Sequence, residues 1–192
     1  MHWLYRNIAD FSREELELAW ENVSPSRKEH ILRFRQPEDR IRSLAGEILA
    51  QQILKEQFSI SSALLHRASS GMPYLTGCSL HLSISHCNQM VACAVSREPV
   101  GIDIEEIRPI KIKLCDRVCV DEEKSYVLGD WQGADDGLCK DPEVTQRFFE
   151  IWTGKEAYFK KLGTGITDLK SVNILHLPRQ VEIADGYMVQ MI

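Results

Sequence analysis

The sequence predicts an α+β protein, because helical and strand patterns occupy separate stretches of its 192 residues. Two segments, 37–58 and 146–162, repeat apolar residues at the 3.6-residue period of an amphipathic helix. Between them, residues 80–105 change to the alternating pattern of β-strands. A composition of 44% hydrophobic and 27% charged residues is typical of a globular chain that buries a core.

Helix start signals mark the amino-terminal part of the chain. Ser12 and Glu15 have the spacing of a capping box and predict a helix that ends near Val23. Ser24 followed by Pro25 predicts the start of a second helix, since proline suits the first helical position. The long helix over 37–58 follows.

Three consecutive strands are predicted next, at 80–85, 90–95 and 100–105. In the first, Leu82 and Ile84 point to one face and their polar neighbours to the other. Short turn-forming segments separate the strands, so we expect a meander.

The remaining part of the chain is predicted to begin near Pro99. A helix is expected over 110–128, followed by a polar loop over 129–141 and the second amphipathic helix. Strands at 172–175 and 187–192 are expected to close the chain.

Charge and apolar runs exclude several classes of protein. A net charge of −5 argues against a general nucleic-acid binder, and the longest apolar run, Met90 to Val95, is too short to span a membrane. The amino terminus has no leader pattern, so we expect a cytoplasmic protein. Between Arg27 and Arg42, six basic residues stand against three acidic ones, an excess that suits a small polyanion or an acidic partner.

Two acids lie two residues apart in the third predicted strand. Asp103 and Glu105 therefore project from one face, while Ile102 and Ile104 point into the core. Mg²⁺ binds through one or two protein carboxylates and completes its shell with phosphates and water. The pattern suits a metal–phosphate site, and the alternative is an exposed strand face with scattered acids.

The second amphipathic helix carries an acid and a cation on one face. Glu156 and Lys160 stand at i and i+4, which also describes an ordinary surface pair. Lys155 falls in register with the apolar stripe, where a surface pair gives no reason for a charge. His86 follows Ser85 at a strand end, where it suits a phosphate contact or a solvated side chain.

These pieces resemble a known family when taken together and in order. The segments GIDIEEIRP (101–109) and FFEIWTGKEAYFKKLGTGI (148–166) resemble the 4′-phosphopantetheinyl transferase signatures G-[IV]-D-[IV]-E and W-[ST]-x-K-E-[AS]-x-x-K. Upstream, SPSRKEHILRF, PEDRIRSLAGEIL, GMPYL and HLSISHC resemble the family's amino-terminal segments. The similarity runs from about residue 24 to 172 and fits the long, surfactin-synthetase-activating type better than the short type.

The resemblance implies a fold and a reaction. It implies two similar α+β lobes, 1–98 and 99–192, related by a pseudo-twofold axis with the active site in the cleft between them. It implies transfer of phosphopantetheine from coenzyme A to a serine of an apo acyl, peptidyl or polyketide carrier protein, with release of 3′,5′-ADP. Two lobes in one chain make a monomer sufficient. The sequence does not identify the carrier.

The resemblance also implies residue roles. Asp103, Glu105 and Glu156 would surround Mg²⁺, with Asp103, Glu156 and Lys160 as the catalytic residues. Glu156 would take the proton of the carrier serine, and Lys160 would stabilise the departing 3′,5′-ADP. The coenzyme A contacts would come from Arg27, His30, Arg42, Ser85, His86, Lys155 and Lys160. Glu123 matches a further acidic position of the family.

One departure from the family pattern concerns coenzyme A. Met72 stands where relatives often carry a lysine that reaches the nucleotide, so weaker binding is expected. Two alternatives stay open: a relative that binds coenzyme A or a carrier without transfer, and a magnesium-dependent nucleotide hydrolase.

Overall fold

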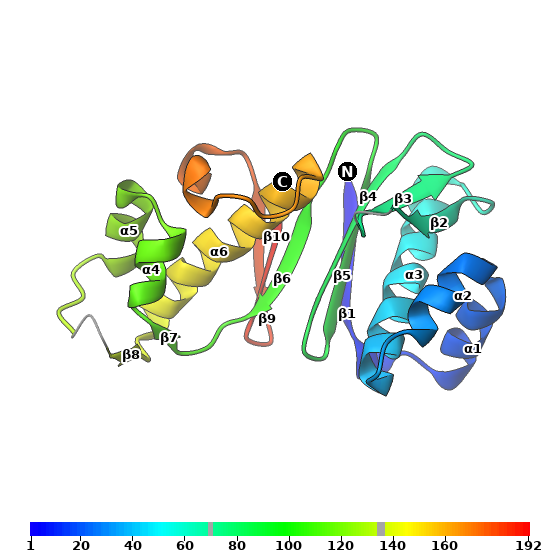
Figure 1. Ribbon diagram of the computed structural model, residues 1–192, viewed down its shortest axis with the longest axis horizontal. Coiled ribbons are helices and arrows are strands. Elements are labelled where there is room, and N and C mark those ends of the chain that lie inside the picture. Colours follow the sequence, from blue (N-terminus) through cyan, green and yellow to red (C-terminus); the bar gives the residue numbers. More distant parts are fainter. Residues whose placement is uncertain (69–70, 134–136) are drawn as a thin grey trace.

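The computed structural model describes residues 1–68, 71–133 and 137–192, and it is a mixed α+β structure with antiparallel sheets. The first sheet has the order β1-β5-β4 and the second the order β6-β10-β9. Figure 1 shows both sheets in the middle of the molecule, with α3 outside the first and α6 outside the second. The predicted α+β class is confirmed.

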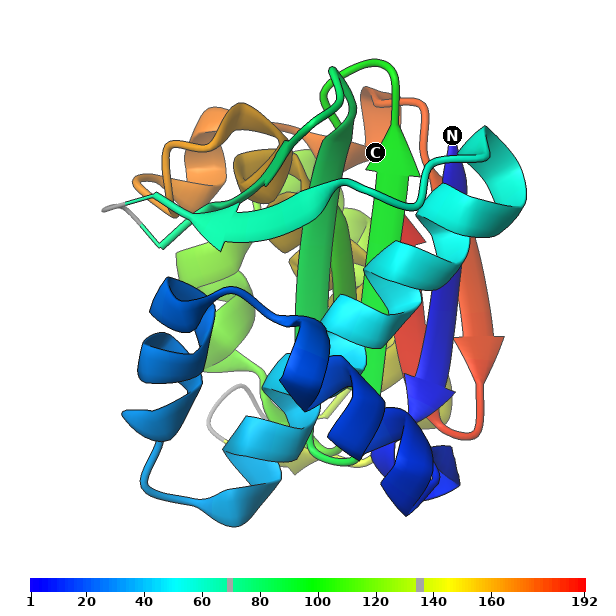
Figure 2. The same ribbon diagram turned by 90° about the vertical axis from the view of Figure 1, so that its right-hand side faces the viewer.

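The amino-terminal half is built around the first sheet. Its strands are β1 (His2–Asn7), β4 (His81–Cys87) and β5 (Met90–Ser96), and a separate hairpin joins β2 (Leu64–Arg67) to β3 (Pro73–Thr76). Its helices are α1 (Arg13–Asn22), α2 (Pro25–Leu32) and α3 (Pro37–Phe58). Figure 2 shows these helices on the outer face of the sheet.

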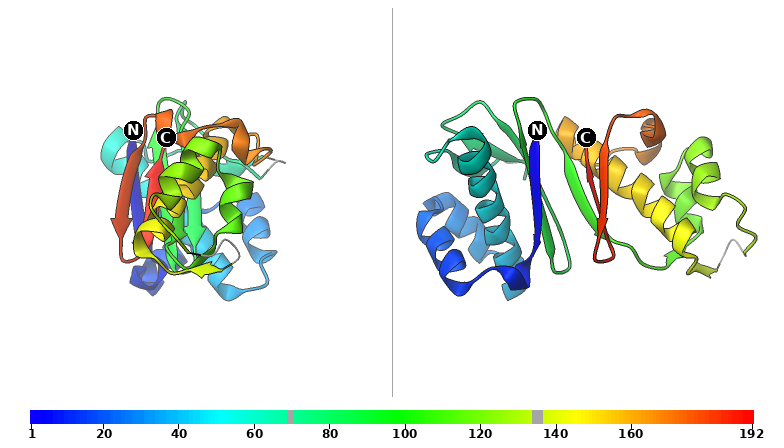
Figure 3. Two further views of the ribbon diagram at one scale, coloured as in Figure 1. Left: turned by 90° about the vertical axis from the view of Figure 1, so that its left-hand side faces the viewer. Right: turned by 180° about the vertical axis from the view of Figure 1, so that it is seen from behind.

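The carboxyl-terminal half is built around the second sheet. Its strands are β6 (Ile102–Glu106), β9 (Gln180–Ala184) and β10 (Tyr187–Met191), and β7 (Ile110–Lys111) pairs with β8 (Leu138–Cys139). Its helices are α4 (Lys113–Val118), α5 (Asp121–Leu128) and α6 (Pro142–Leu162). Short 3₁₀ turns lie at Ile8–Asp10, Leu169–Ser171 and Ile174–His176. The view from behind shows the two chain ends close together (Figure 3).

The helix start signals are confirmed in detail. The Ser12 hydroxyl accepts from the Glu15 N–H at 3.1 Å, and the Glu15 carboxylate accepts from the Ser12 N–H at 2.7 Å. Pro25 opens α2, and α3 has the predicted bounds. The start of α1 therefore follows from local hydrogen bonds, and the starts of α2 and α3 from a proline in the first turn.

The expected meander is wrong, because β6 leaves the first sheet. It pairs antiparallel with β10, and Gly101 exchanges backbone hydrogen bonds with Ile192 instead of continuing the ladder of β5. A Cβ at Gly101 would lie 1.8 Å from the Ala157 carbonyl oxygen, so only glycine lets α6 approach the start of β6 this closely. That approach brings α6 beside the acids of β6.

Two further expectations are corrected. The helix predicted over 110–128 is broken, since Cys119 and Val120 are extended and the Glu123 carboxylate accepts from the Val120 N–H at 2.9 Å. The strand predicted at 172–175 is a loop with a 3₁₀ turn. Of the predicted loop 129–141, residues 134–136 lie outside the described residues. No helix in the described parts of the chain is long and apolar enough to cross a membrane.

Candidate active site

The acids of β6 lie where the two halves meet. Asp103 is 3% exposed, and its Oδ1 accepts from the Ser85 hydroxyl at 2.7 Å and from the Lys160 ammonium at 2.6 Å. These partners come from β4 and α6, so one carboxylate joins three elements. Its Oδ2 is buried and has no hydrogen-bond partner among the described residues. A buried carboxylate oxygen in this state is costly, and a cation or a donor would relieve it.

Glu105 lies two residues further along β6 and is half-buried. Its carboxylate accepts from the Trp152 indole at 3.3 Å and from the Cys87 thiol at 3.4 Å, and Arg108 approaches it at 3.7 Å. The prediction that Asp103 and Glu105 share a face, with Ile102 and Ile104 in the core behind, agrees with this geometry.

Glu156 on α6 is half-buried near these acids. Burial raises its pKa to about 7, and the charges of Asp103 and Glu105 add to the effect while Lys160 opposes it. A carboxylate with such a pKa is suited to accept and return a proton near neutral pH.

The three carboxylates fit a metal that arrives with a substrate. The described part of the chain contains no group of three or more His, Cys, Asp or Glu side chains that could hold a metal ion alone. Mg²⁺ does not need such a cage, because substrate phosphates and water complete its octahedron. The unpartnered Asp103 oxygen and the raised pKa of Glu156 are both features that a bound cation would relieve.

A cationic group lies at one end of α2 and β2. Arg27 is buried: it donates to the Ser43 hydroxyl at 2.9 Å and approaches the Glu47 carboxylate at 3.5 Å. Its Nη1, like the Nε of Arg67, is buried without a hydrogen-bond partner among the described residues. Burial lowers the pKa of Arg67 to about 10, and the charge of Arg27 adds to this. An anion bound between these two cations could accept hydrogen bonds from their unused buried donors.

Both histidines predicted to contact coenzyme A lie close to these cations. Desolvation lowers the pKa of His30, and the charges of Arg67 and Arg27 lower it further. The pKa of His86 is also lowered, first by partial desolvation and then by the charges of Arg42, Lys160 and Arg67. An anion among these groups would oppose both shifts.

Arg42 and Ser85 are already engaged by the protein. Arg42 donates to the Asn88 carbonyl and to the Asp39 carboxylate, each at 2.6 Å. The Ser85 hydroxyl lies between Asp103 and Lys160. Ser85 thus lies at the acidic site, and a ligand of either side chain would have to share or displace these contacts.

The structure does not place Lys155 where the sequence predicted a coenzyme A contact, because its side chain does not face the acidic site. Its side chain is fully buried, and its ammonium pairs with Glu123 at 2.6 Å and donates to the Leu169 and Val172 carbonyls at 2.6 and 2.8 Å. All three ammonium protons are thus used inside the carboxyl-terminal half, which excludes the expected contact with coenzyme A in this conformation.

Arg67 is a site residue that the sequence did not reveal. It ends β2, and its guanidinium donates to the Gly71 carbonyl across the hairpin at 2.7 Å. The only sequence signal is a basic residue four positions before a turn glycine, which does not predict burial beside Arg27.

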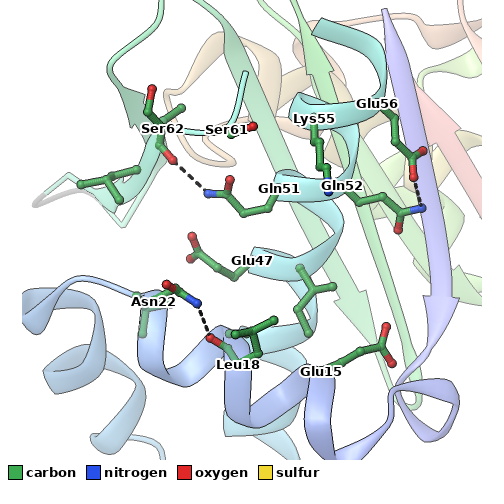
Figure 4. A pocket seen from close by; sticks show the side chains of 15 residues that line it. Glu15, Leu18, Asn22, Glu47, Gln51, Gln52, Lys55, Glu56, Ser61 and Ser62 are labelled. Atoms are coloured by element: carbon green, nitrogen blue, oxygen red, sulfur yellow. Dashed lines mark hydrogen bonds between the residues drawn. The ribbon is translucent and has the colours of Figure 1, made fainter. Parts of the chain in front are cut away.

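A cavity of about 530 Å³ lies elsewhere, between α1, α3 and the segment before β2. Figure 4 shows Glu47, Gln51 and Asn22 among its lining residues. The lining includes neither Asp103 nor Glu156, so this cavity is not the acidic site.

Comparisons with known proteins agree on one family. A model described as "4'-phosphopantetheinyl transferase, N-terminal" matches residues 10–98, and the model of the 4'-phosphopantetheinyl transferase superfamily matches residues 99–186. The chain is 32% identical over 178 residues to the 4'-phosphopantetheinyl transferase Sfp of Bacillus subtilis (strain 168), a match that covers 90% of this chain and 75% of the relative.

Two further relatives carry the same description. The 4'-phosphopantetheinyl transferase gsp of Aneurinibacillus migulanus is 31% identical over 159 residues, which cover 82% of this chain and 63% of that protein. The 4'-phosphopantetheinyl transferase HetI of Nostoc sp. (strain PCC 7120 / SAG 25.82 / UTEX 2576) is 27% identical over 186 residues, covering 92% and 75% of the two chains.

Proposed function

Because the chain belongs to the 4′-phosphopantetheinyl transferase superfamily, we propose that it moves phosphopantetheine from coenzyme A to a serine of an apo acyl or peptidyl carrier protein. 3′,5′-ADP would leave. The observation that carries this proposal is the contact of Asp103 with Lys160 and Ser85, which places an acid, a cation and the two halves of the chain at one point.

The proposed active site lies in the cleft between two lobes, 1–98 and 99–192, related by a pseudo-twofold axis. The two family models meet between residues 98 and 99. Each half also has a long helix on the outer face of a three-stranded antiparallel sheet, which supports two similar lobes. A monomeric state and a cytoplasmic location remain predictions from the sequence.

The acids of the site would hold the metal and move the proton. Asp103 and Glu105, with Glu156, would hold Mg²⁺, which when bound supplies Lewis-acid stabilisation of the pyrophosphate charge. Glu156, directly or through a water, would accept the proton of the carrier serine as the serine oxygen attacks the β-phosphate. Burial and the neighbouring acids raise its pKa to about 7 in the metal-free protein, and bound Mg²⁺ would favour the deprotonated form that accepts the proton.

Lys160 would stabilise the charge that develops on the departing phosphate. Its ammonium lies 2.6 Å from Asp103 and 2.7 Å from the Ser85 hydroxyl, so α6 delivers a fixed positive charge to the acidic site. A fixed charge needs no reorganisation during the reaction, which is the main source of its catalytic effect.

The cations of the amino-terminal half would bind the coenzyme A phosphates. Arg67 joins Arg27, His30, Arg42 and His86 in this role, and its unused buried Nε supports the assignment. Arg67 also offers a positive charge in the hairpin where Met72 replaces the lysine of many relatives. We therefore propose that Met72 weakens coenzyme A binding less than the sequence alone indicates.

The two alternatives have less support. Asp103, Glu105, Glu156 and Lys160 are all present and lie on β6 and α6 at one site, which is more than binding without transfer requires. A nucleotide hydrolase would use the same carboxylates but would release product from coenzyme A without a carrier.

Mass spectrometry of apo carrier proteins tests the proposal. Each carrier is incubated with the protein, coenzyme A and Mg²⁺, and matched reactions omit metal, enzyme or carrier. We expect a metal-dependent gain of one phosphopantetheine on the carrier. Consumption of coenzyme A without carrier would indicate the hydrolase, and coenzyme A binding with no transfer to any carrier type would indicate the binder.

A further inference from the structure

A buried ion pair links α6, the helix that carries Glu156 and Lys160, to α5. Lys155 on α6 and Glu123 on α5 are both 0% exposed, and their charged atoms lie 2.6 Å apart. Glu123 also accepts from the Val120 N–H at 2.9 Å and from the Ile174 N–H at 2.8 Å. The pair therefore satisfies backbone groups before and after α6 as well as its own charges.

The ammonium of Lys155 fixes the chain that follows α6. Its bonds to the carbonyls of Leu169 and Val172 hold the segment that returns from the end of the helix. Three contacts from one atom, each between 2.6 and 2.8 Å, restrain the rotation of α6 at this point.

Stability alone does not explain such a pair. Removing two charges from water is costly, and apolar replacements of buried pairs are often neutral or stabilising. Both side chains are fully buried, so no solvent compensates either charge. Apolar burial is non-directional, whereas the hydrogen bonds of the Lys155 ammonium have preferred directions.

Rotation of α6 matters because the proposed catalytic groups follow Lys155 directly. With 3.6 residues per turn, Glu156 projects about 100° and Lys160 about 140° away from Lys155 around the helix axis. A turn of about 20° at a radius of about 5 to 6 Å would move their charged ends by about 2 Å. A misplacement of about 1 Å is enough to cost about 10²-fold in rate.

We infer that Lys155 and Glu123 are positioning residues that set the rotation of α6. This rotation orients Glu156 and Lys160 toward the acids of β6. The inference rests on the proposed transferase function. It replaces both expectations from the sequence, that Lys155 contacts coenzyme A and that Glu123 is a further acid of unassigned role.

The test separates alignment from stability with a charge-neutral double variant, Lys155→Met with Glu123→Gln. The glutamine oxygen keeps one acceptor for the backbone, and no charge is left buried without a partner. We expect the variant to fold but to be less stable than wild type, because the Leu169 and Val172 carbonyls lose their donor. Under conditions where it is fully folded, kcat should be lowered about tenfold or more, with KM for coenzyme A changed less than about twofold. The control is Glu143→Gln with Arg147→Met, an exposed ion pair on the same helix, which should leave kcat unchanged.

A readout without turnover makes the test independent of the activity. The Trp152 indole donates to Glu105 from α6, so its N–H resonance reports how the helix is set against β6. We expect this resonance to shift in the double variant and to stay in place in the control. If the double variant misfolds, Glu123→Asp retains the charge but shortens the side chain, and it should show the same loss of kcat and the same shift.

The outcomes are distinct. A folded double variant with wild-type kcat and an unmoved Trp152 resonance would overturn the inference and leave the transferase intact. A wild-type protein that transfers to no carrier would refute the proposed function, and the positioning role would fall with it.

Discussion

Glu156 shows how position within the site, more than residue type, determines chemistry. Its sequence neighbourhood predicted an acid one helical turn before a lysine. The structure adds burial and two nearby carboxylates, which together raise its pKa to about 7. The same environment that destabilises the carboxylate prepares it to accept a proton.

Replacing Glu156 with glutamine should abolish the rise of the transfer rate with pH. Wild-type kcat/KM should rise with pH through about 7 as Glu156 loses its proton, and Glu156→Gln should lower transfer by about 10² to 10⁴-fold with no such rise. The measurement is the initial rate of carrier modification between pH 5.5 and 8.5. Glu143→Gln, on an exposed turn of the same helix, is the control. A variant rate near wild type would remove Glu156 as the base.

Stability should respond in the opposite sense to activity. The folded pKa of Glu156 lies above its ordinary value of 4.5, so the stabilising contribution is complete below that pH and is lost as pH rises through about 7. Without metal, Glu156→Gln should therefore be more stable than wild type at pH 8, by on the order of 1 kcal/mol. Urea unfolding at pH 5 and pH 8 measures this difference.

Arg67 should matter for coenzyme A affinity. Arg67→Ala removes a half-buried cation whose buried Nε has no partner among the described residues, and loss of a charge-assisted hydrogen bond should raise KM for coenzyme A about tenfold with little change in kcat. Steady-state kinetics measure this, with the exposed Arg13→Ala as the control. An unchanged KM would place the phosphates elsewhere. The pKa of His30 should rise in the variant, since Arg67 lowers it.

At the scale of single residues, the sequence predicted which residues belong to the site better than it predicted their burial and contacts. Spacing placed Asp103 and Glu105 on one face, but Asp103 lies buried beside Lys160 and not on an exposed polar face. Lys155 was recognised as anomalous, yet its partner Glu123 is 32 positions away and came into contact only through folding. Burial and distant partners depend on tertiary packing, which local patterns do not contain.

At the scale of elements, local signals succeeded where hydrogen bonds are local. The bounds of α3 follow from the proline at its start and the left-handed Ser59 after its end. The chain from 110 to 128 was misassigned because the Glu123 carboxylate bonds the Val120 N–H and starts a new helix there. The strand β9 was missed because Val181 and Ile183 are exposed and give no core pattern.

The packing of α6 on β6 depends on one glycine. Gly101→Ala would place a Cβ 1.8 Å from the Ala157 carbonyl oxygen and 2.7 Å from the Lys161 nitrogen, both backbone atoms that cannot move alone. We expect a loss of stability of about 3 kcal/mol and reduced transfer, because α6 must shift away from β6. Urea unfolding measures the first effect.

Gly46→Ala is the matched control for this glycine. Its Cβ would approach the Cγ2 methyl group of Ile84 at 2.9 Å, which is a side-chain atom and a longer contact than the backbone contacts at Gly101. Alanine also favours a helix interior by about 0.5 to 1 kcal/mol over glycine. The loss should therefore be smaller than that of Gly101→Ala, and an equal loss would contradict the close-approach argument.

At the scale of the molecule, the two sheets share one core. Met90, Ala92 and Ala94 of β5 pack with Ile102 and Ile104 of β6, and Val189 and Met191 of β10 complete the cluster. Polar contacts cross the same boundary, since Tyr5 donates to Glu182 and Asn88 donates to Glu106. The periodicity of the sequence did not predict this arrangement. The two sheets can pack face to face only because β6 leaves the first sheet, and periodicity does not show that step.

A shared core predicts that the halves unfold together. Either half alone would expose the apolar face that it now buries against the other, and it would lose the favourable free energy of that burial. Urea unfolding followed by tryptophan fluorescence and by far-ultraviolet circular dichroism should therefore give one transition with coincident midpoints. Trp20 reports on the amino-terminal half and Trp152 on the other, so separate midpoints in single-tryptophan variants would show that each half is stable alone. A single transition would mean that the acids of β6 and the cations of α2 and β2 form a site only in the complete fold.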